Sequence, residues 1–106
     1  MPNITFVSRV KIDSSSDATP SYVPVPMLSG TCLAMMVHGS TRIARVVFDG
    51  NVTLQPGETE TANIAAMLLA SDLDEMTAGA RFELRNGPFN RWGECEIIEI
   101  SRIDSD

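Results

Sequence analysis

The chain lacks the features that mark several large classes of protein. Its 106 residues contain no run of 18 apolar residues, and the N-terminus, MPNITFVSRVK, has no basic segment followed by an apolar one. Neither a membrane helix nor a secretory signal peptide is therefore predicted, and we expect a cytoplasmic protein without membrane contact. No Gly-rich phosphate loop ending in Gly-Lys-Ser or Gly-Lys-Thr occurs, which argues against GTP binding and hydrolysis.

Positive charge is scarce. The sequence has 8 Lys and Arg residues against 14 Asp and Glu residues, for a formal net charge of -6, and Lys11 is its one lysine. Nucleic-acid binding depends on basic side chains that neutralise phosphates, so this acidic composition disfavours a nucleic acid as the partner and favours a basic or amphiphilic protein. A local arginine patch is still compatible with the negative total.

Histidine and cysteine are also rare, and this limits catalytic and metal chemistry. His38 is the single histidine, and Cys32 and Cys95 form no close-spaced ligand pair with it or with each other, so we expect no metal and no cofactor. In a reducing compartment the two cysteines are predicted to be buried free thiols. A nucleophilic site would have to combine His38 with Ser40 or Cys32, but six residues of straight strand span about 20 Å. We therefore expect no enzyme, with His38 as a polar residue at a strand end; a small enzyme using His38 is the alternative.

The composition is that of one folded domain. Hydrophobic residues make up 43% and charged residues 21% of the sequence, which is close to the average of globular proteins. We expect a single domain over residues 1–106. Within it, residues 13–19 are predicted to form an exposed Ser/Asp loop, and residues 101–106 a frayed tail.

Alternating apolar and polar residues predict strands. Residues 4–12 place four apolar side chains and Ser8 on one face, and residues 42–48 repeat the pattern. Residues 31–37 are apolar on both faces, which is typical of a strand that is covered on both sides or that meets a partner on its outer face. Turns rich in Gly, Pro and Asp separate these segments, and Gln55-Pro56-Gly57-Glu58 has the arrangement of a type II turn.

The segment from residue 61 to residue 76, TANIAAMLLASDLDEM, is ambiguous. Its Ala, Leu and Met residues favour a helix by local propensity, whereas a strand would be apolar on both faces. On propensity alone the segment is predicted to be helical. The carboxylates near its end, those of Asp72, Asp74 and Glu75, are interpreted as a solvated turn, with a cation site of oxygen ligands as the alternative.

The C-terminal part of the sequence predicts a hairpin. Residues 81–85 alternate, Asn86-Gly87 is a strong hairpin turn signal, and residues 89–100 form the return strand. The alternation of the return strand slips after Ile97, which a bulge near Gly93 or burial of both faces would explain. Six or seven short strands separated by turns indicate an antiparallel sandwich or a small barrel.

Four segments carry a resemblance to a known family. ARVVFDG, LQPGETETANIAAMLLA, AGARFELRNG and RWGECEII, within about residues 41–100, resemble in order and content the C-terminal domain of elongation factor Tu. The resemblance implies a small closed antiparallel β-barrel with Greek-key connections, and it implies a strand rather than a helix at residues 62–70. In the family this domain contributes to aminoacyl-tRNA binding and to contacts with the nucleotide-exchange factor. The last strand departs from the family pattern, because Cys95 stands where a second glycine is often found.

Together these observations predict a non-catalytic protein-binding barrel. It would act as an adaptor, a mimic of the translation factor or an immunity-type protein, and its partner would be another protein or a second copy of the chain. A tRNA- or RNA-binding module is the alternative that the resemblance leaves open. Aromatic and arginine side chains dominate interface hot spots, so the predicted partner site is an exposed patch on the closing hairpin. It comprises Arg81, Arg85, Arg91 and Trp92.

Overall fold

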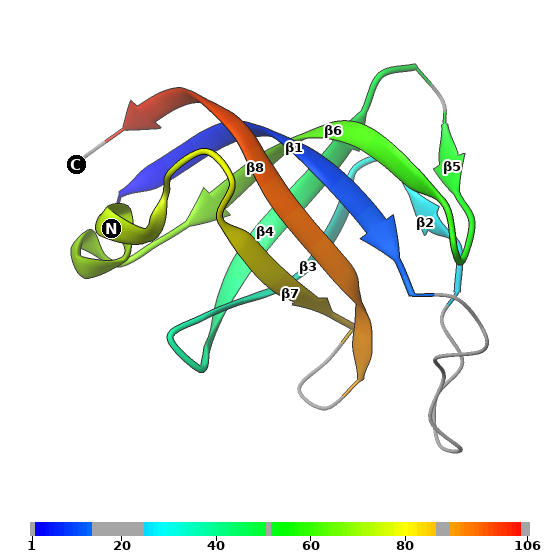
Figure 1. Ribbon diagram of the computed structural model, residues 1–106, viewed down its shortest axis with the longest axis horizontal. Coiled ribbons are helices and arrows are strands. Elements are labelled where there is room, and N and C mark those ends of the chain that lie inside the picture. Colours follow the sequence, from blue (N-terminus) through cyan, green and yellow to red (C-terminus); the bar gives the residue numbers. More distant parts are fainter. Residues whose placement is uncertain (1, 14–24, 51, 87–89, 105–106) are drawn as a thin grey trace.

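The computed structural model describes residues 2–13, 25–50, 52–86 and 90–104, and it confirms the predicted all-β barrel (Figure 1). Antiparallel pairing closes the barrel in the order β1-β6-β4-β3-β7-β8. Within the described ranges its strands are β1 (Asn3–Ile12), β3 (Thr31–Val37), β4 (Ser40–Phe48), β6 (Thr59–Met67), β7 (Arg81–Arg85) and β8 (Arg91–Asp104). No helix in this part of the chain is long and apolar enough to cross a membrane.

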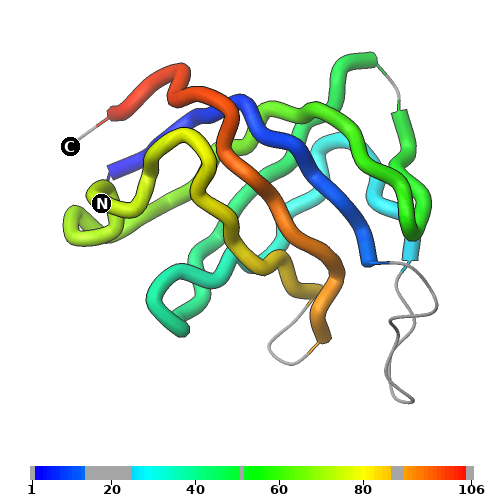
Figure 2. Tube along the Cα trace, viewed as in Figure 1, coloured from blue at the N-terminus to red at the C-terminus, as the bar shows by residue number. Residues whose placement is uncertain are grey.

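Two smaller elements lie at opposite ends of the barrel (Figures 1 and 2). At one end β2 (Met27–Leu28) pairs with β5 (Thr53–Leu54) in a separate two-stranded sheet. At the other end η2 (Ala70–Glu75), a 3-10 helix, follows β6. The type II turn predicted before β6 is supported by Gly57, whose φ of 86° lies in the left-handed region that glycine tolerates.

The core is built from the alternating faces that the sequence predicts. In β1 the four apolar side chains of the inner face are fully buried, and Ser8 is buried among them. The Ser8 hydroxyl donates a hydrogen bond of 2.9 Å to the carbonyl oxygen of Glu96, so the buried polar group has a partner. The other large, fully buried apolar side chains come from the barrel strands, from β2 and from the residue that follows β6, and they include Met27, Met35, Val46, Ile64, Leu68, Leu84 and Ile97.

The helix favoured by local propensity at residues 61–76 is wrong. Residues 59–67 form β6, which pairs with β1 on one side and with β4 on the other. Two ladders of backbone hydrogen bonds, together with the burial of Ala62, Ile64 and Ala66, outweigh the weak preference of Ala and Met for a helix. The strand implied by the family resemblance is present up to Met67, and residues 70–75 form the short helix η2.

Bulges in β8 explain the slip in its alternation. The register with β1 passes from Ser8↔Ile97 to Val7↔Glu99, so Ile98 is an extra residue at this point. Near Gly93 the register with β7 also shifts, so the bulge predicted there is present, but the slip after Ile97 that it was meant to explain comes from the bulge at Ile98. Gly93 lies so close to β1 that a Cβ atom would stand 2.0 Å from the carbonyl oxygen of Lys11. Only a glycine fits this crossing.

The frayed tail predicted from residue 101 is wrong as far as Asp104. Strand β8 continues to Asp104 and pairs with the first residues of β1, where Asn3 faces Asp104. Residues 102–104 form backbone hydrogen bonds with the first residues of β1, and this pairing keeps them in the strand. Residues 105–106 and residues 14–19 of the predicted Ser/Asp loop lie outside the described residues, as does the turn at 87–89. The hairpin itself is confirmed by the pairing of β7 with β8.

Candidate functional site

Trp92 is not the exposed aromatic anchor that the sequence predicts. Its side chain is 5% exposed, and the indole Nε1 donates a hydrogen bond of 2.7 Å to the carbonyl oxygen of Val25. The cause is the bulge, because Trp92 is the extra residue between Gly93, which faces Leu84, and Arg91, which faces Arg85. A bulge redirects the side chain, here into the core.

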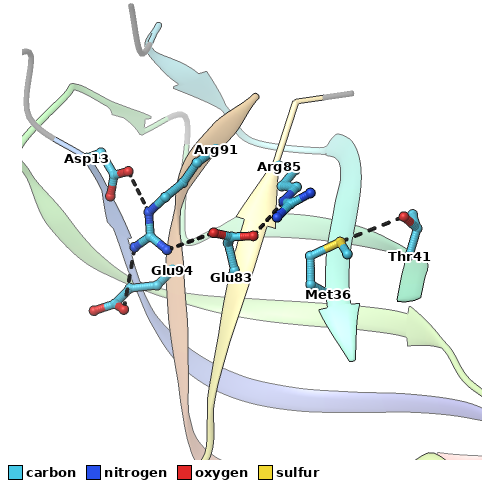
Figure 3. Close-up of polar contacts among 7 residues, drawn as sticks. All are labelled: Asp13, Met36, Thr41, Glu83, Arg85, Arg91 and Glu94. Atoms are coloured by element: carbon cyan, nitrogen blue, oxygen red, sulfur yellow. Dashed lines mark hydrogen bonds and ion pairs between the residues drawn. The ribbon is translucent and has the colours of Figure 1, made fainter. Parts of the chain in front are cut away.

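The three arginines of the predicted patch lie on the outside of the barrel but are engaged with carboxylates. The Arg91 guanidinium forms ion pairs with Asp13 (2.7 Å), Glu83 (3.1 Å) and Glu94 (3.7 Å), as Figure 3 shows. Glu83 also accepts a hydrogen bond from Arg85. Burial acts to raise the pKa of Glu83, but the hydrogen bonds from Arg85 and Arg91 outweigh it and hold that pKa below its usual value. The hydrogen bond to Asp13 is the main reason that the pKa of Arg91 is raised.

Arg81 belongs to a row of alternating charges across three strands. The register places Glu96 of β8 between Arg9 of β1 and Arg81 of β7. The Glu96 carboxylate lies 4.0 Å from the Arg9 guanidinium and 3.4 Å from that of Arg81. We call this surface the charged face; its outward residues are Arg9, Lys11, Arg81, Glu83, Arg85, Arg91, Glu94 and Glu96. Because its cations lie beside carboxylates, this surface is not a basic patch.

A second outer surface, on β4 and β6, has a different character. Its large apolar side chains are well exposed: Ile43 by 65%, Met67 by 46% and Val47 by 43%. Leu69, which follows β6, is 43% exposed. We call the surface formed by Ile43, Val47, Ala65, Met67 and Leu69 the apolar face. Ile43, Met67 and Leu69 line a groove of about 220 Å³ together with Thr41 and Arg42.

The polar groups of this groove satisfy one another. The Arg42 guanidinium donates to both carboxylate oxygens of Asp72, at 2.6 and 3.2 Å, and to the carbonyl oxygen of Thr41 at 3.1 Å. Asp72 also accepts a hydrogen bond of 2.8 Å from the backbone N–H of Leu69. With its hydrogen-bonding capacity used internally, the groove is suited to an apolar side chain rather than to a charged one.

The solvated turn predicted for the acidic segment is wrong at Asp72. Its side chain is 1% exposed, because η2 folds back over the barrel and brings the carboxylate onto Arg42. The hydrogen bond from Arg42 is the largest cause of a lowered pKa at Asp72. Asp74 and Glu75 are exposed, as predicted. No group of three or more metal-ligating side chains occurs within the described ranges.

His38 stands at a strand end, as predicted, in the turn between β3 and β4. Its φ is 53°, and its Nε2 lies 3.5 Å from the Glu75 carboxylate. Among the described contacts none joins the imidazole to Ser40 or to Cys32. The prediction of two buried thiols is confirmed for Cys95, whose pKa burial raises to about 12, and is wrong for Cys32, which is exposed.

Sequence reasoning missed the apolar face as a site, although its signal was present. Residues 64–69 are all apolar, so a strand here is apolar on both sides, and only one side fits inside a barrel. The other side therefore faces outward. No protein-family model matches the chain, and no curated protein matches it. Its function is accordingly inferred from the fold and from the two outer faces.

Proposed function

We propose that the chain is a non-catalytic protein-binding barrel that resembles the C-terminal domain of elongation factor Tu and works in the cytoplasm as an adaptor or mimic. One observation carries the proposal. Ile43, Met67 and Leu69 converge on a single groove on the outside of a barrel whose interior is already filled by other side chains. Contiguous exposed apolar side chains of this kind are typical of interaction sites.

The charged face is the weaker candidate for a docking surface. Its arginines already lie beside carboxylates of the same chain, and a partner would have to replace these contacts. Exposed ion pairs contribute little free energy, so such an exchange offers little gain. The same pairing disfavours RNA, because arginines that face carboxylates neutralise few phosphates.

Affinity purification from the native cell extract, with quantitative mass spectrometry, tests the proposal. The tagged chain is compared with an Ile43→Asp/Met67→Asp variant, which places two charges in the groove. Leu28→Asp is the control, because Leu28 is 62% exposed and lines a separate hollow with Ser29, Val52 and Thr53. We expect one or more partners to be lost from the double variant and retained by the control.

Two results would contradict the proposal. One is retention of every partner by the double variant while circular dichroism shows that it is folded. The other is capture of tRNA that falls steeply with added salt, which would favour the RNA alternative. An Arg81→Ala variant in the same experiment tests the charged face, and its partners are expected to match those of the unmodified chain.

A further inference from the structure

Charge changes sign along the apolar face. Arg45 faces Ala65 across β4 and β6, and continuing this register by two residues places Ile43 beside Met67. Two residues further on, Thr41 and Leu69 close the groove, and η2 follows with the exposed carboxylates of Asp74 and Glu75. Along β4 the outward side chains are therefore Val47, then the cation Arg45, then Ile43 at the groove, and the two anions of η2 follow on the far side of the groove. Successive outward residues on a strand are about 7 Å apart, so the cation and the groove lie within one interface patch.

The charges on the two sides of the groove have few partners within the residues that the structure describes. Neither Arg45 nor Asp74 forms an ion pair within the described part of the chain. Glu75 shares its carboxylate with His38 at a distance of 3.5 Å, and both side chains are about half exposed. These groups contrast with Arg42, at the centre, whose donors are taken up by Asp72 and Thr41. The charges on either side of the groove are thus available to an external partner.

We propose that the partner on the apolar face is a second copy of this chain, docked about a two-fold axis through the groove. The inference rests on the proposed function, because it takes the apolar face to be a protein interface. In a two-fold interface the same patch is used by both copies and is rotated by half a turn. With the axis perpendicular to the strands, the rotation sets the two grooves face to face and brings Arg45 of each copy opposite Asp74 and Glu75 of the other.

This arrangement fits what is known of interfaces in general. Apolar anchors lie at the centre, where they are removed from water, and charges lie at the rim, where they set orientation. It also counters the repulsion between two chains with a net charge of -6, since opposite charges meet at both ends of the contact. A groove whose rim carried one sign of charge would not be complementary to itself.

Sedimentation analysis of the full chain from about 1 to about 500 μM tests self-association. We expect the mass to rise from one chain toward two across this range. Ile43→Asp is expected to weaken the dimer at least about tenfold by placing a carboxylate at the centre. Leu28→Asp, with the same change in charge on another surface, is the control and is expected to dimerise like the unmodified chain.

A charge-swap pair tests the orientation. Arg45→Glu alone and Asp74→Arg/Glu75→Arg alone each create two like-charged contacts per dimer, so each variant is expected to dimerise about tenfold more weakly. In a mixture of the two, both contacts join opposite charges, and the mixed dimer is expected to regain the affinity of the unmodified chain. Circular dichroism of each variant checks that it is folded.

Two outcomes would overturn the inference: a native chain that stays monomeric up to the highest concentration, or a mixture that associates no better than its components. Either result is distinguishable from failure of the proposed function. If the chain is monomeric but the Ile43→Asp/Met67→Asp variant still loses a partner from cell extract, the apolar face binds another protein and only self-association is rejected.

Discussion

The charged face and the apolar face belong to the same barrel but handle their outward side chains differently. On the charged face the strand register sets Glu96 between Arg9 and Arg81, so neighbouring strands supply the counter-charge. On the apolar face, neighbouring strands place Ile43 and Met67 at one groove, where nothing within the described part of the chain covers them. Register therefore decides whether an outward side chain finds its partner inside the molecule or has to find it outside.

The difference has an energetic meaning. Exposed ion pairs contribute little to folding, so the charged face mainly keeps a stretch of barrel wall solvated and in register. Exposed apolar side chains leave favourable burial unused, and a second molecule can supply that burial. Removing an outward side chain of the charged face should therefore change folding stability little, whereas placing a charge on the apolar face should weaken association.

Gly93→Ala should have the largest effect, because it breaks the wall that carries the charged face. The new Cβ would lie 2.0 Å from the Lys11 carbonyl oxygen and 2.9 Å from the Cα of Ile12, so β8 and β1 must separate. We expect a loss of about 3 kcal/mol, at the upper end of overpacking costs. This corresponds to a fall in Tm on the order of 15 °C, measured by circular dichroism.

Gly39→Ala is the control for this variant. Gly39 has a φ of 74° and open space around it, so an alanine there meets backbone strain without a clash. We expect it to cost about 1 kcal/mol. Equal losses at the two glycines would show that steric overlap at the β1–β8 crossing is not the cause.

Asp72→Ala should have the next largest effect. It acts beside the groove of the apolar face, because its partner Arg42 lines that groove. The substitution leaves the Arg42 guanidinium and the backbone N–H of Leu69 without their carboxylate partner. The Arg42 side chain is 11% exposed and can recover some hydration, so we expect a loss of about 2 kcal/mol, or about 10 °C in Tm. A change of less than about 2 °C would mean that η2 is not held by this pair.

Asp72 also predicts a pH dependence. Its pKa in the folded protein lies below the ordinary value of 3.8, chiefly through the hydrogen bond with Arg42. A lowered pKa stabilises the folded state above the ordinary value, and this contribution is lost as the pH falls through the lowered one. Stability to urea should therefore be steady from neutral pH to about pH 5 and should decline below about pH 4. Asp72→Asn should show a shallower decline, and an unchanged profile would assign the decline to other carboxylates.

Trp92→Phe should have a moderate effect. It keeps most of the buried ring but removes the Nε1 donor, which leaves the Val25 carbonyl oxygen without this hydrogen bond. We expect a loss of about 1 kcal/mol, or about 5 °C in Tm, by circular dichroism. If Trp92 were instead an exposed anchor, the substitution would leave stability unchanged and would weaken binding.

The sequence was sufficient for an antiparallel all-β fold, with a sandwich or a small barrel left open, because its strands are marked by alternation and by turns; the closed barrel was implied by the family resemblance. The inner faces of β1 and β4 could be assigned from period two alone. Local propensity gave the wrong element at β6. The helix preference of Ala, Met and Leu is weak, and backbone hydrogen bonding to β1 on one side and to β4 on the other outweighs it. There the family resemblance supplied what the local sequence did not.

The site was harder to predict because it depends on register. Trp92 and Arg91 are adjacent in sequence, yet a bulge buries the tryptophan and a carboxylate from β7 neutralises the arginine. The Arg42–Asp72 pair joins residues 30 positions apart, and no spacing rule connects them. The exposed apolar side of β6 was visible in the sequence, but its neighbour Ile43 emerged only from the pairing with β4.

Arg81→Ala should have the smallest effect and completes the test of the two faces. The Arg81 side chain is 67% exposed, and its partner Glu96 retains Arg9 on the opposite side. We expect Tm to stay within about 2 °C and to respond little to added salt, because screened surface pairs contribute little. Self-association should also be unchanged. A loss of association in Arg81→Ala, with Ile43→Asp associating normally, would move the interface to the charged face, because the register that pairs its charges would then be serving a partner rather than the fold.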